Sequence, residues 1–102
     1  MINKLTLINE LLVDRFGKED AFRIMTRLTE ECGELAAQVN HFEGSGVKHE
    51  KHGSPDKMKL AKEVQDVLRC ALQIAEHYEI REELQLSIDN SLQELAKEKH
   101  RL

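Results

Sequence analysis

The sequence lacks several features, and each absence narrows the class of protein. No apolar run approaches the roughly 20 residues that a helix needs to cross a bilayer. The first ten residues, MINKLTLINE, interrupt their apolar positions with polar ones, unlike a signal peptide. Basic residues are fewer than acidic ones, and the formal charge of −4 argues against a surface for nucleic acid polymers. Cys32 and Cys70 are the only cysteines and fall inside helical patterns, which favours reduced thiols over a disulfide. We therefore expect a cytoplasmic protein that binds neither membranes nor nucleic acid polymers.

Strand-like alternation is also missing, because the apolar residues recur at intervals of three and four, the period of an α-helix. This spacing predicts four helices, at about residues 3–15, 19–43, 55–79 and 81–100. Gly17 is the expected end of the first helix, and SPDK, with Ser54 as cap, the start of the third. EGSGVKHEKHGSPD, between the second and third helices, is rich in glycine and charge and predicts a loop. We expect an all-α, single-domain chain folded as an antiparallel four-helix bundle.

Each predicted helix carries an apolar stripe that we expect to face the core. The stripes of the first three helices comprise Leu5, Ile8, Leu11 and Leu12; Met25, Leu28, Cys32, Leu35, Val39 and Phe42; and Leu60, Val64, Val67, Ala71, Ile74 and Tyr78. That of the fourth comprises Leu84, Ile88, Leu92 and Leu95. Further apolar residues, such as Ala36, Leu68 and Leu72, lie off these stripes, and a helix that is apolar on more than one side needs more than one neighbour. We therefore predict a homodimer or a larger homo-oligomer.

The second and third helices carry a repeated pattern of carboxylates. LTEECGELAAQV and LAKEVQDVLRCA align with an offset of 32 residues, so that Glu31 matches Glu63 and Glu34 matches Asp66. Each pair has i, i+3 spacing and lies next to the apolar stripe of its own helix. When the stripes pack together, four carboxylates converge from two helices.

Carboxylates at this density repel one another unless something compensates their charge. Two unit charges about 4 Å apart repel by roughly 1 kcal/mol in water and roughly 4 kcal/mol at an intermediate dielectric. A divalent cation removes the repulsion, and oxygen ligands without His or Cys favour Mg²⁺ or Mn²⁺ over zinc. Asp66 is a poor mid-helix residue, and Gly33 costs roughly 1 kcal/mol relative to alanine there, which predicts close backbone approach or ligand access. The alternative interpretation is that these glutamates form a solvated acidic helix face without a bound ion, since glutamate is a good helix former.

The motif EECGE, followed by EVQD, resembles the EExxE…ExxD signature of the MazG-like, all-α nucleotide pyrophosphohydrolases. The resemblance covers about residues 16–79 clearly and the fourth helix loosely. It implies hydrolysis of nucleoside triphosphates to the monophosphate and pyrophosphate, with Mg²⁺ as cofactor and Mn²⁺ as a substitute, to cleanse or regulate a nucleotide pool. By position, Glu31, Glu34, Glu63 and Asp66 would be the metal ligands. Glu30 and Glu31 would be the catalytic residues, with Glu30 orienting or deprotonating the attacking water.

The resemblance also implies contacts with the substrate, in part through residues that depart from the family pattern. Lys59 matches a lysine that grips phosphate in some members, although a solvated lysine is an equal alternative. Asn90 matches part of an Asn-x-x-Arg element on the last helix, but Gln93 stands where the arginine would be, so phosphate contacts would come instead from Arg27, Lys97 or the loop lysines Lys48 and Lys51. The tryptophan that some relatives stack on the base is absent, so the sequence predicts no base preference. Two alternatives stay open: a phosphoribosyl-ATP pyrophosphohydrolase, and a non-catalytic helical homo-oligomer that binds nucleotide or metal.

Overall fold

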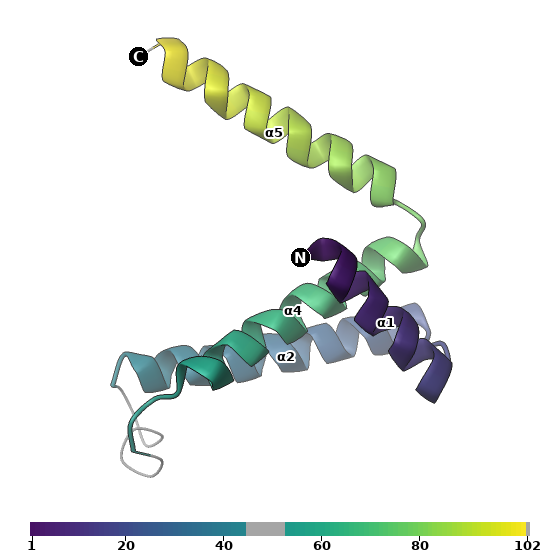
Figure 1. The fold of residues 1–102 in the computed structure, drawn as a ribbon, viewed down its shortest axis with the longest axis vertical. Helices are drawn as coiled ribbons and strands as arrows, with labels where there is room; N and C mark the ends of the chain where they lie inside the picture. Colours follow the sequence, from purple (N-terminus) through teal and green to yellow (C-terminus); the bar gives the residue numbers. More distant parts are fainter. Residues whose placement is uncertain (45–52, 102) are drawn as a thin grey trace.

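The computed structural model describes residues 1–44 and 53–101, and this part of the chain is helical without strands. The helices are α1 (Ile2–Phe16), α2 (Ala21–Phe42), α4 (Lys57–His77) and α5 (Arg81–Arg101), shown in Figure 1. The predicted all-α class and the four helices are confirmed, and every predicted bound lies within two residues of the observed one. Residues 45–52 of the predicted loop lie outside the described residues.

Local hydrogen bonds explain where the helices begin and end. Gly17 ends α1, as predicted: its φ is 88° and its N–H donates to the Val13 carbonyl at 2.8 Å. The predicted start of α4 at SPDK, with Ser54 as cap, is wrong by two residues. The helix begins after Asp56 instead, because the Asp56 carboxylate accepts a hydrogen bond from the Met58 N–H at 2.8 Å.

The helices α2 and α4 lie side by side in antiparallel directions and share the most extensive contact in the fold (Figure 1). At one end of the pair, His41 Nε2 donates to the Gly53 carbonyl at 2.6 Å. At the other end, α1 crosses α4. Asn9, only 1% exposed, donates from Nδ2 to the Arg69 carbonyl at 3.0 Å and so attaches α1 to α4.

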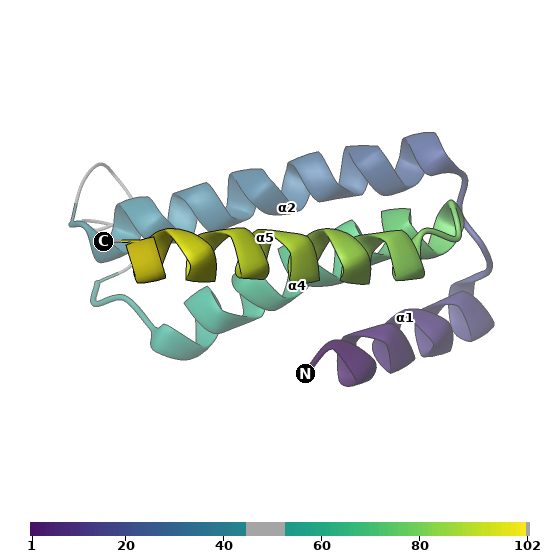
Figure 2. The same ribbon diagram turned by 90° about the horizontal axis from the view of Figure 1, so that it is seen from above.

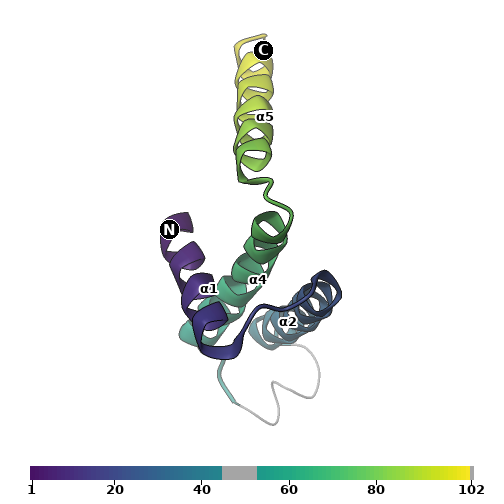
Figure 3. The same ribbon diagram turned by 90° about the vertical axis from the view of Figure 1, so that its right-hand side faces the viewer.

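The fourth helix, α5, does not complete a closed bundle within one chain. Among the described helices it contacts α4 alone, and it extends away from α1 and α2 (Figures 1 and 3). Only in the view from above does α5 overlie the α2–α4 pair (Figure 2). The radius of gyration, 17.2 Å, exceeds the roughly 13 Å of a compact 100-residue domain. The expected four-helix bundle is thus a three-helix core with a projecting helix, because the turn after α4, where Glu79 has a φ of 55°, directs α5 outward.

The core is small, and the predicted apolar stripes are covered only in part. Several predicted stripe residues are exposed instead: Leu11, Met25, Cys32, Val39, Val64, Ala71, Tyr78, Ile88, Leu92 and Leu95. Polar residues such as Gln38 on α2 and Arg69 and Gln73 on α4 are buried in their place. Because these polar groups face inward, an apolar face of each helix is left uncovered. No described helix is long and apolar enough to span a membrane.

Candidate metal centre and adjacent pocket

Three carboxylates converge where α2 faces α4. Glu31 of α2 and Glu63 and Asp66 of α4 each offer one oxygen, and these three oxygens lie within 4.8 Å of one another. All three side chains are half-buried. Three of the four predicted metal ligands are therefore brought together, and they come from both helices as the repeated pattern predicts. We call this set the acidic cluster.

The other predicted acids lie beside the acidic cluster and are exposed. Glu34 contributes no oxygen to it, but its charge raises the pKa of both Glu31 and Glu63. Glu30 is exposed and likewise stands outside the cluster. A Cβ added at Gly33 would meet nothing within 4 Å, so the close backbone approach predicted there is wrong within one chain, and this side of α2 is open.

The electrostatics of the acidic cluster are unfavourable without a cation. Burial is the main cause that raises the pKa of Glu31 and of Glu63, and the charges of neighbouring acids add to it. The Oε2 atom of each of these two glutamates is buried without a hydrogen-bond partner. Buried acceptors are normally satisfied, so these two oxygens fit a cation, and an all-oxygen donor set suits Mg²⁺ or Mn²⁺.

Asp66 differs from the two glutamates because basic side chains already neutralise it. Lys62 Nζ donates to both Asp66 carboxylate oxygens, at 2.7 and 2.8 Å. Arg69 Nε lies 3.9 Å from Oδ1 of the same carboxylate. The Lys62 ammonium thus pairs with the carboxylate that a metal ion would need as a ligand. Metal binding therefore has to compete with this ion pair.

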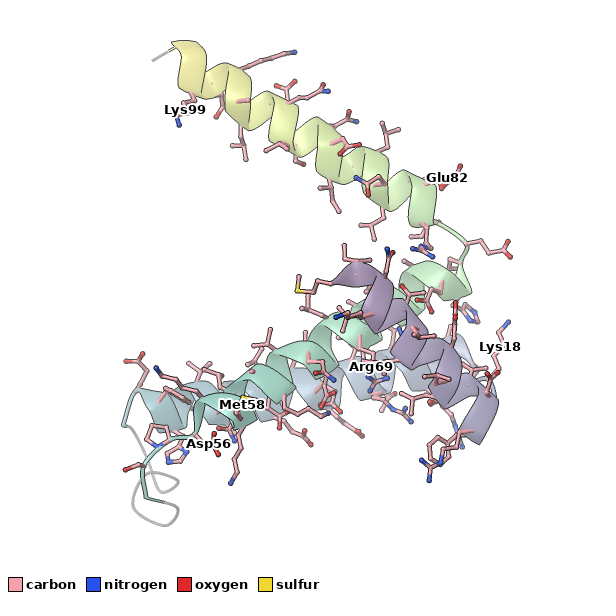
Figure 4. The ribbon with its side chains drawn as sticks, viewed as in Figure 1. Lys18, Asp56, Met58, Arg69, Glu82 and Lys99 are labelled. Atoms are coloured by element: carbon pink, nitrogen blue, oxygen red, sulfur yellow. The ribbon has the colours of Figure 1, made fainter. Side chains whose placement is uncertain are left out.

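A pocket of about 530 Å³ opens next to the acidic cluster, between the end of α1, the start of α2 and the C-terminal half of α4. Its lining includes four basic residues: Lys18, Arg23, Arg27 and Arg69. Figure 4 shows Arg69 on α4 near the crossing of α1, and Lys18 just beyond the end of α1. Arg27 is paired with Glu19, Nη1 to Oε1, at 2.8 Å.

The fully buried thiol of Cys70 shows how closely the pocket and the acidic cluster adjoin. Burial is the largest cause that raises the pKa of this thiol. Arg69 and Arg27 from the pocket lower that pKa, while Glu31 and Asp66 from the cluster raise it. The pocket and the acidic cluster therefore adjoin, in agreement with the 3.9 Å between Arg69 of the pocket and Asp66 of the cluster.

The residues predicted to contact substrate are scattered. Arg27 lines the pocket one turn before Glu31. Lys59 is exposed on α4 one turn before Glu63. Asn90 lies on α5, which touches neither α1 nor α2, so it is remote from the acidic cluster within one chain.

Sequence reasoning missed several residues that line the pocket. Arg69 follows Asp66 by three positions, and Arg23 precedes Arg27 by four, so helical spacing alone places each on the same side as a residue already singled out. Gln73 follows Arg69 by another four. These spacings were a usable signal, because i, i+3 and i, i+4 neighbours share a helix face.

The chain was compared with known proteins. No curated protein and no solved structure matched it. The family model of the MazG nucleotide pyrophosphohydrolase domain matches residues 20–101, which include the acidic cluster and three of the four helices in full. The chain therefore belongs to the MazG nucleotide pyrophosphohydrolase family.

Proposed function

We propose that the protein is a Mg²⁺-dependent nucleoside triphosphate pyrophosphohydrolase that converts (d)NTP and water to (d)NMP and pyrophosphate. One observation carries the proposal: in a chain of this family, Glu31 and Glu63, each with one buried oxygen that lacks a partner, converge with Asp66 from two facing helices. The competing interpretation is a solvated acidic face, in which water would hydrate those oxygens. Cleansing or regulation of a nucleotide pool is the role we assign to this activity.

The acids divide the work of the reaction. Glu31, Glu63 and Asp66, with Glu34 beside them, are the proposed metal ligands. Bound there, Mg²⁺ supplies charge neutralisation of the triphosphate and a more acidic bound water. Glu30 is free to orient the attacking water or take its proton, because it is exposed beside Glu31 and outside the acidic cluster. Water adds to the α-phosphorus, and the bond to the bridging oxygen breaks so that pyrophosphate leaves.

We also propose that the protein works as a homodimer or a dimer of dimers. The support is the apolar surface that one chain leaves uncovered, which on α5 includes Leu86, Leu92 and Leu95, exposed by 59%, 67% and 63%. A second copy packed on α5 would cover these side chains. Light scattering at micromolar concentration tests this proposal, and a monomer would contradict it.

The activity is tested by incubating the protein and Mg²⁺ with canonical and modified (d)NTPs and with phosphoribosyl-ATP. We expect pyrophosphate and a monophosphate, separated by ion chromatography, and incorporation of ¹⁸O from labelled water into the monophosphate. Glu31→Gln and Glu63→Gln should remove turnover, while the matched control Glu98→Gln, at an exposed position of α5, should not. Release of orthophosphate would contradict the proposed bond cleavage. Binding of Mg²⁺ without turnover of any substrate would favour the non-catalytic alternative.

A further inference from the structure

We infer that the pocket beside the acidic cluster is a base-recognition pocket, in which Gln73, Glu76 and His77 hydrogen-bond the edge of the nucleotide base. The inference deepens the proposed function and rests on it, because it assigns the nucleoside end of the substrate to a site distinct from the acids.

The pocket has the size and lining of a small-molecule site. Its volume of about 530 Å³ falls in the range of roughly 300–1,000 Å³ typical of ligand pockets. Leu12, Phe16 and Ile24 supply apolar surface on the side formed by α1 and α2. Phe16 is 73% exposed, so an aromatic ring is available at the edge of the pocket for contact with a planar ligand.

Three polar atoms on the α4 side of the pocket have no hydrogen-bond partner although they are buried. They are Gln73 Oε1, Glu76 Oε1 and His77 Nδ1. The Gln73 side chain belongs to a residue only 9% exposed, so water reaches it poorly. Leaving buried polar groups unpaired is unfavourable, and a base edge offers the alternating donors and acceptors that would satisfy all three.

The order of groups along α4 matches the order of groups in a nucleotide. Asp66 belongs to the acidic cluster, Arg69 follows one turn later, and Gln73 and His77 follow at successive turns. The 11 residues from Asp66 to His77 span about 16 Å at 1.5 Å per residue. When the phosphates bind at the acidic cluster, the sugar and the base therefore extend along the same face of α4 into the pocket.

A pocket for phosphate alone fits the charges less well. The Arg27 guanidinium is already paired with Glu19, and Arg69 lies near Asp66 and donates to Asn9 Oδ1 at 3.4 Å. Lys18 and Arg23 also line the pocket but are exposed, whereas the buried atoms without a partner belong to an amide, an imidazole and one oxygen of a carboxyl. The Glu76 carboxyl would repel a phosphate when ionised, although burial raises its pKa. The amide and the imidazole suit a base edge, because both can hydrogen-bond without carrying a charge.

The test compares kcat/KM for triphosphates that differ only in the base, in the wild type and in Gln73→Leu. We expect a wild-type preference of about tenfold or more for one base, and a loss of most of that preference in the variant, because a site built to hydrogen-bond a group discriminates strongly. The matched control is Gln85→Leu, at an exposed position of α5, which should keep the preference. The Tm increase caused by Mg²⁺ should be equal in both variants and the wild type, since the acids are untouched.

Two results would overturn the inference while leaving the proposed function intact. One is an equal loss of kcat/KM for every base in Gln73→Leu. The other is an equal affinity of the wild type for all nucleoside monophosphates in calorimetry with Mg²⁺, which would show that the pocket does not distinguish the bases. If no triphosphate is hydrolysed, the proposed function fails, and calorimetric binding of nucleoside monophosphates with Mg²⁺ still decides the inference. If Gln73→Leu does not fold, His77→Gln is measured and read in the same way.

Discussion

Replacing Glu63 with glutamine should make the metal-free protein more stable and the metal-bound protein less stable than the wild type. The substitution keeps the shape of the side chain and removes one charge from the acidic cluster. Without a cation, that charge repels Glu31 and Asp66, whose nearest oxygens lie within 4.8 Å. With a cation, the same charge is a ligand. The sign of the effect should therefore reverse when Mg²⁺ is added.

The magnitude follows from the distance. Two unit charges 4.8 Å apart repel by about 0.9 kcal/mol in water and about 3.5 kcal/mol at an effective dielectric of 20. The carboxylates are half-buried and Lys62 lies close to Asp66, so we expect a net gain near the lower value, about 1 kcal/mol. For a domain of this size, that corresponds to a Tm increase of about 4–8 °C. Mg²⁺ at 100 times its Kd stabilises the wild type by about 2.7 kcal/mol, which exceeds the gain from the substitution.

The assay is thermal unfolding followed by circular dichroism, in EDTA and in a Mg²⁺ series, at one protein concentration. Glu98→Gln is the control, because it removes one charge from an exposed position of α5 and should behave as the wild type in both conditions. The reasoning is refuted if Glu63→Gln is no more stable than the wild type in EDTA and retains the full increase in Tm with Mg²⁺. That result would mean that the acids neither strain the fold nor hold the ion.

Three further predictions concern residues around the acidic cluster and the pocket. Lys62→Met should lower the Kd for Mg²⁺ by about twofold in calorimetry, because an exposed i, i+4 ion pair with Asp66, worth about 0.3–0.5 kcal/mol, no longer competes; an unchanged Kd would contradict this competition. Burial raises the pKa of Glu76 above its ordinary value of 4.5, so the stability that this carboxyl contributes is present below pH 4.5 and is lost as pH rises through the folded-state pKa. In urea unfolding at pH 7, Glu76→Gln should therefore be more stable than the wild type. The difference should disappear on acidification, and a difference that does not depend on pH would contradict this effect of burial. Asn9→Ala should lower the free energy of unfolding by about 1–3 kcal/mol, because it removes the buried hydrogen bonds to Arg69 that attach α1 to α4; urea unfolding with no change in midpoint would show that these bonds contribute nothing.

The helices and the acidic cluster were predictable because their signals are local. Capping and periodicity located every helix within two residues. The acidic cluster forms because its residues hold matching positions on two helices that pack together. This places Glu31 of one helix opposite Glu63 and Asp66 of the other. Neither inference needs knowledge of distant contacts.

The full packed side of α2 and the place of α5 were not predictable, because both depend on distant contacts. The second helix is apolar on more than one side, and the periodicity favoured Met25 and Val39 over Ile24, which is the buried one. Which face turns inward depends on how α2 packs against α4, and the face that does so buries the polar Gln38. The direction of α5 depends on the left-handed backbone of Glu79, a non-glycine residue that no turn motif marks.

The two thiols differ in exposure, so their reactivity reports on the opening of the fold without any substitution. Cys70 has no exposed surface and a raised pKa, so an alkylating reagent reaches it only when α2 and α4 separate. Cys32 is exposed on the open side of α2 and should react at once. Timed alkylation followed by mass spectrometry would therefore report, in unmodified protein, the opening rate of the helix pair that carries the acids. Slow alkylation of Cys32 would show that another copy of the chain covers this face of α2.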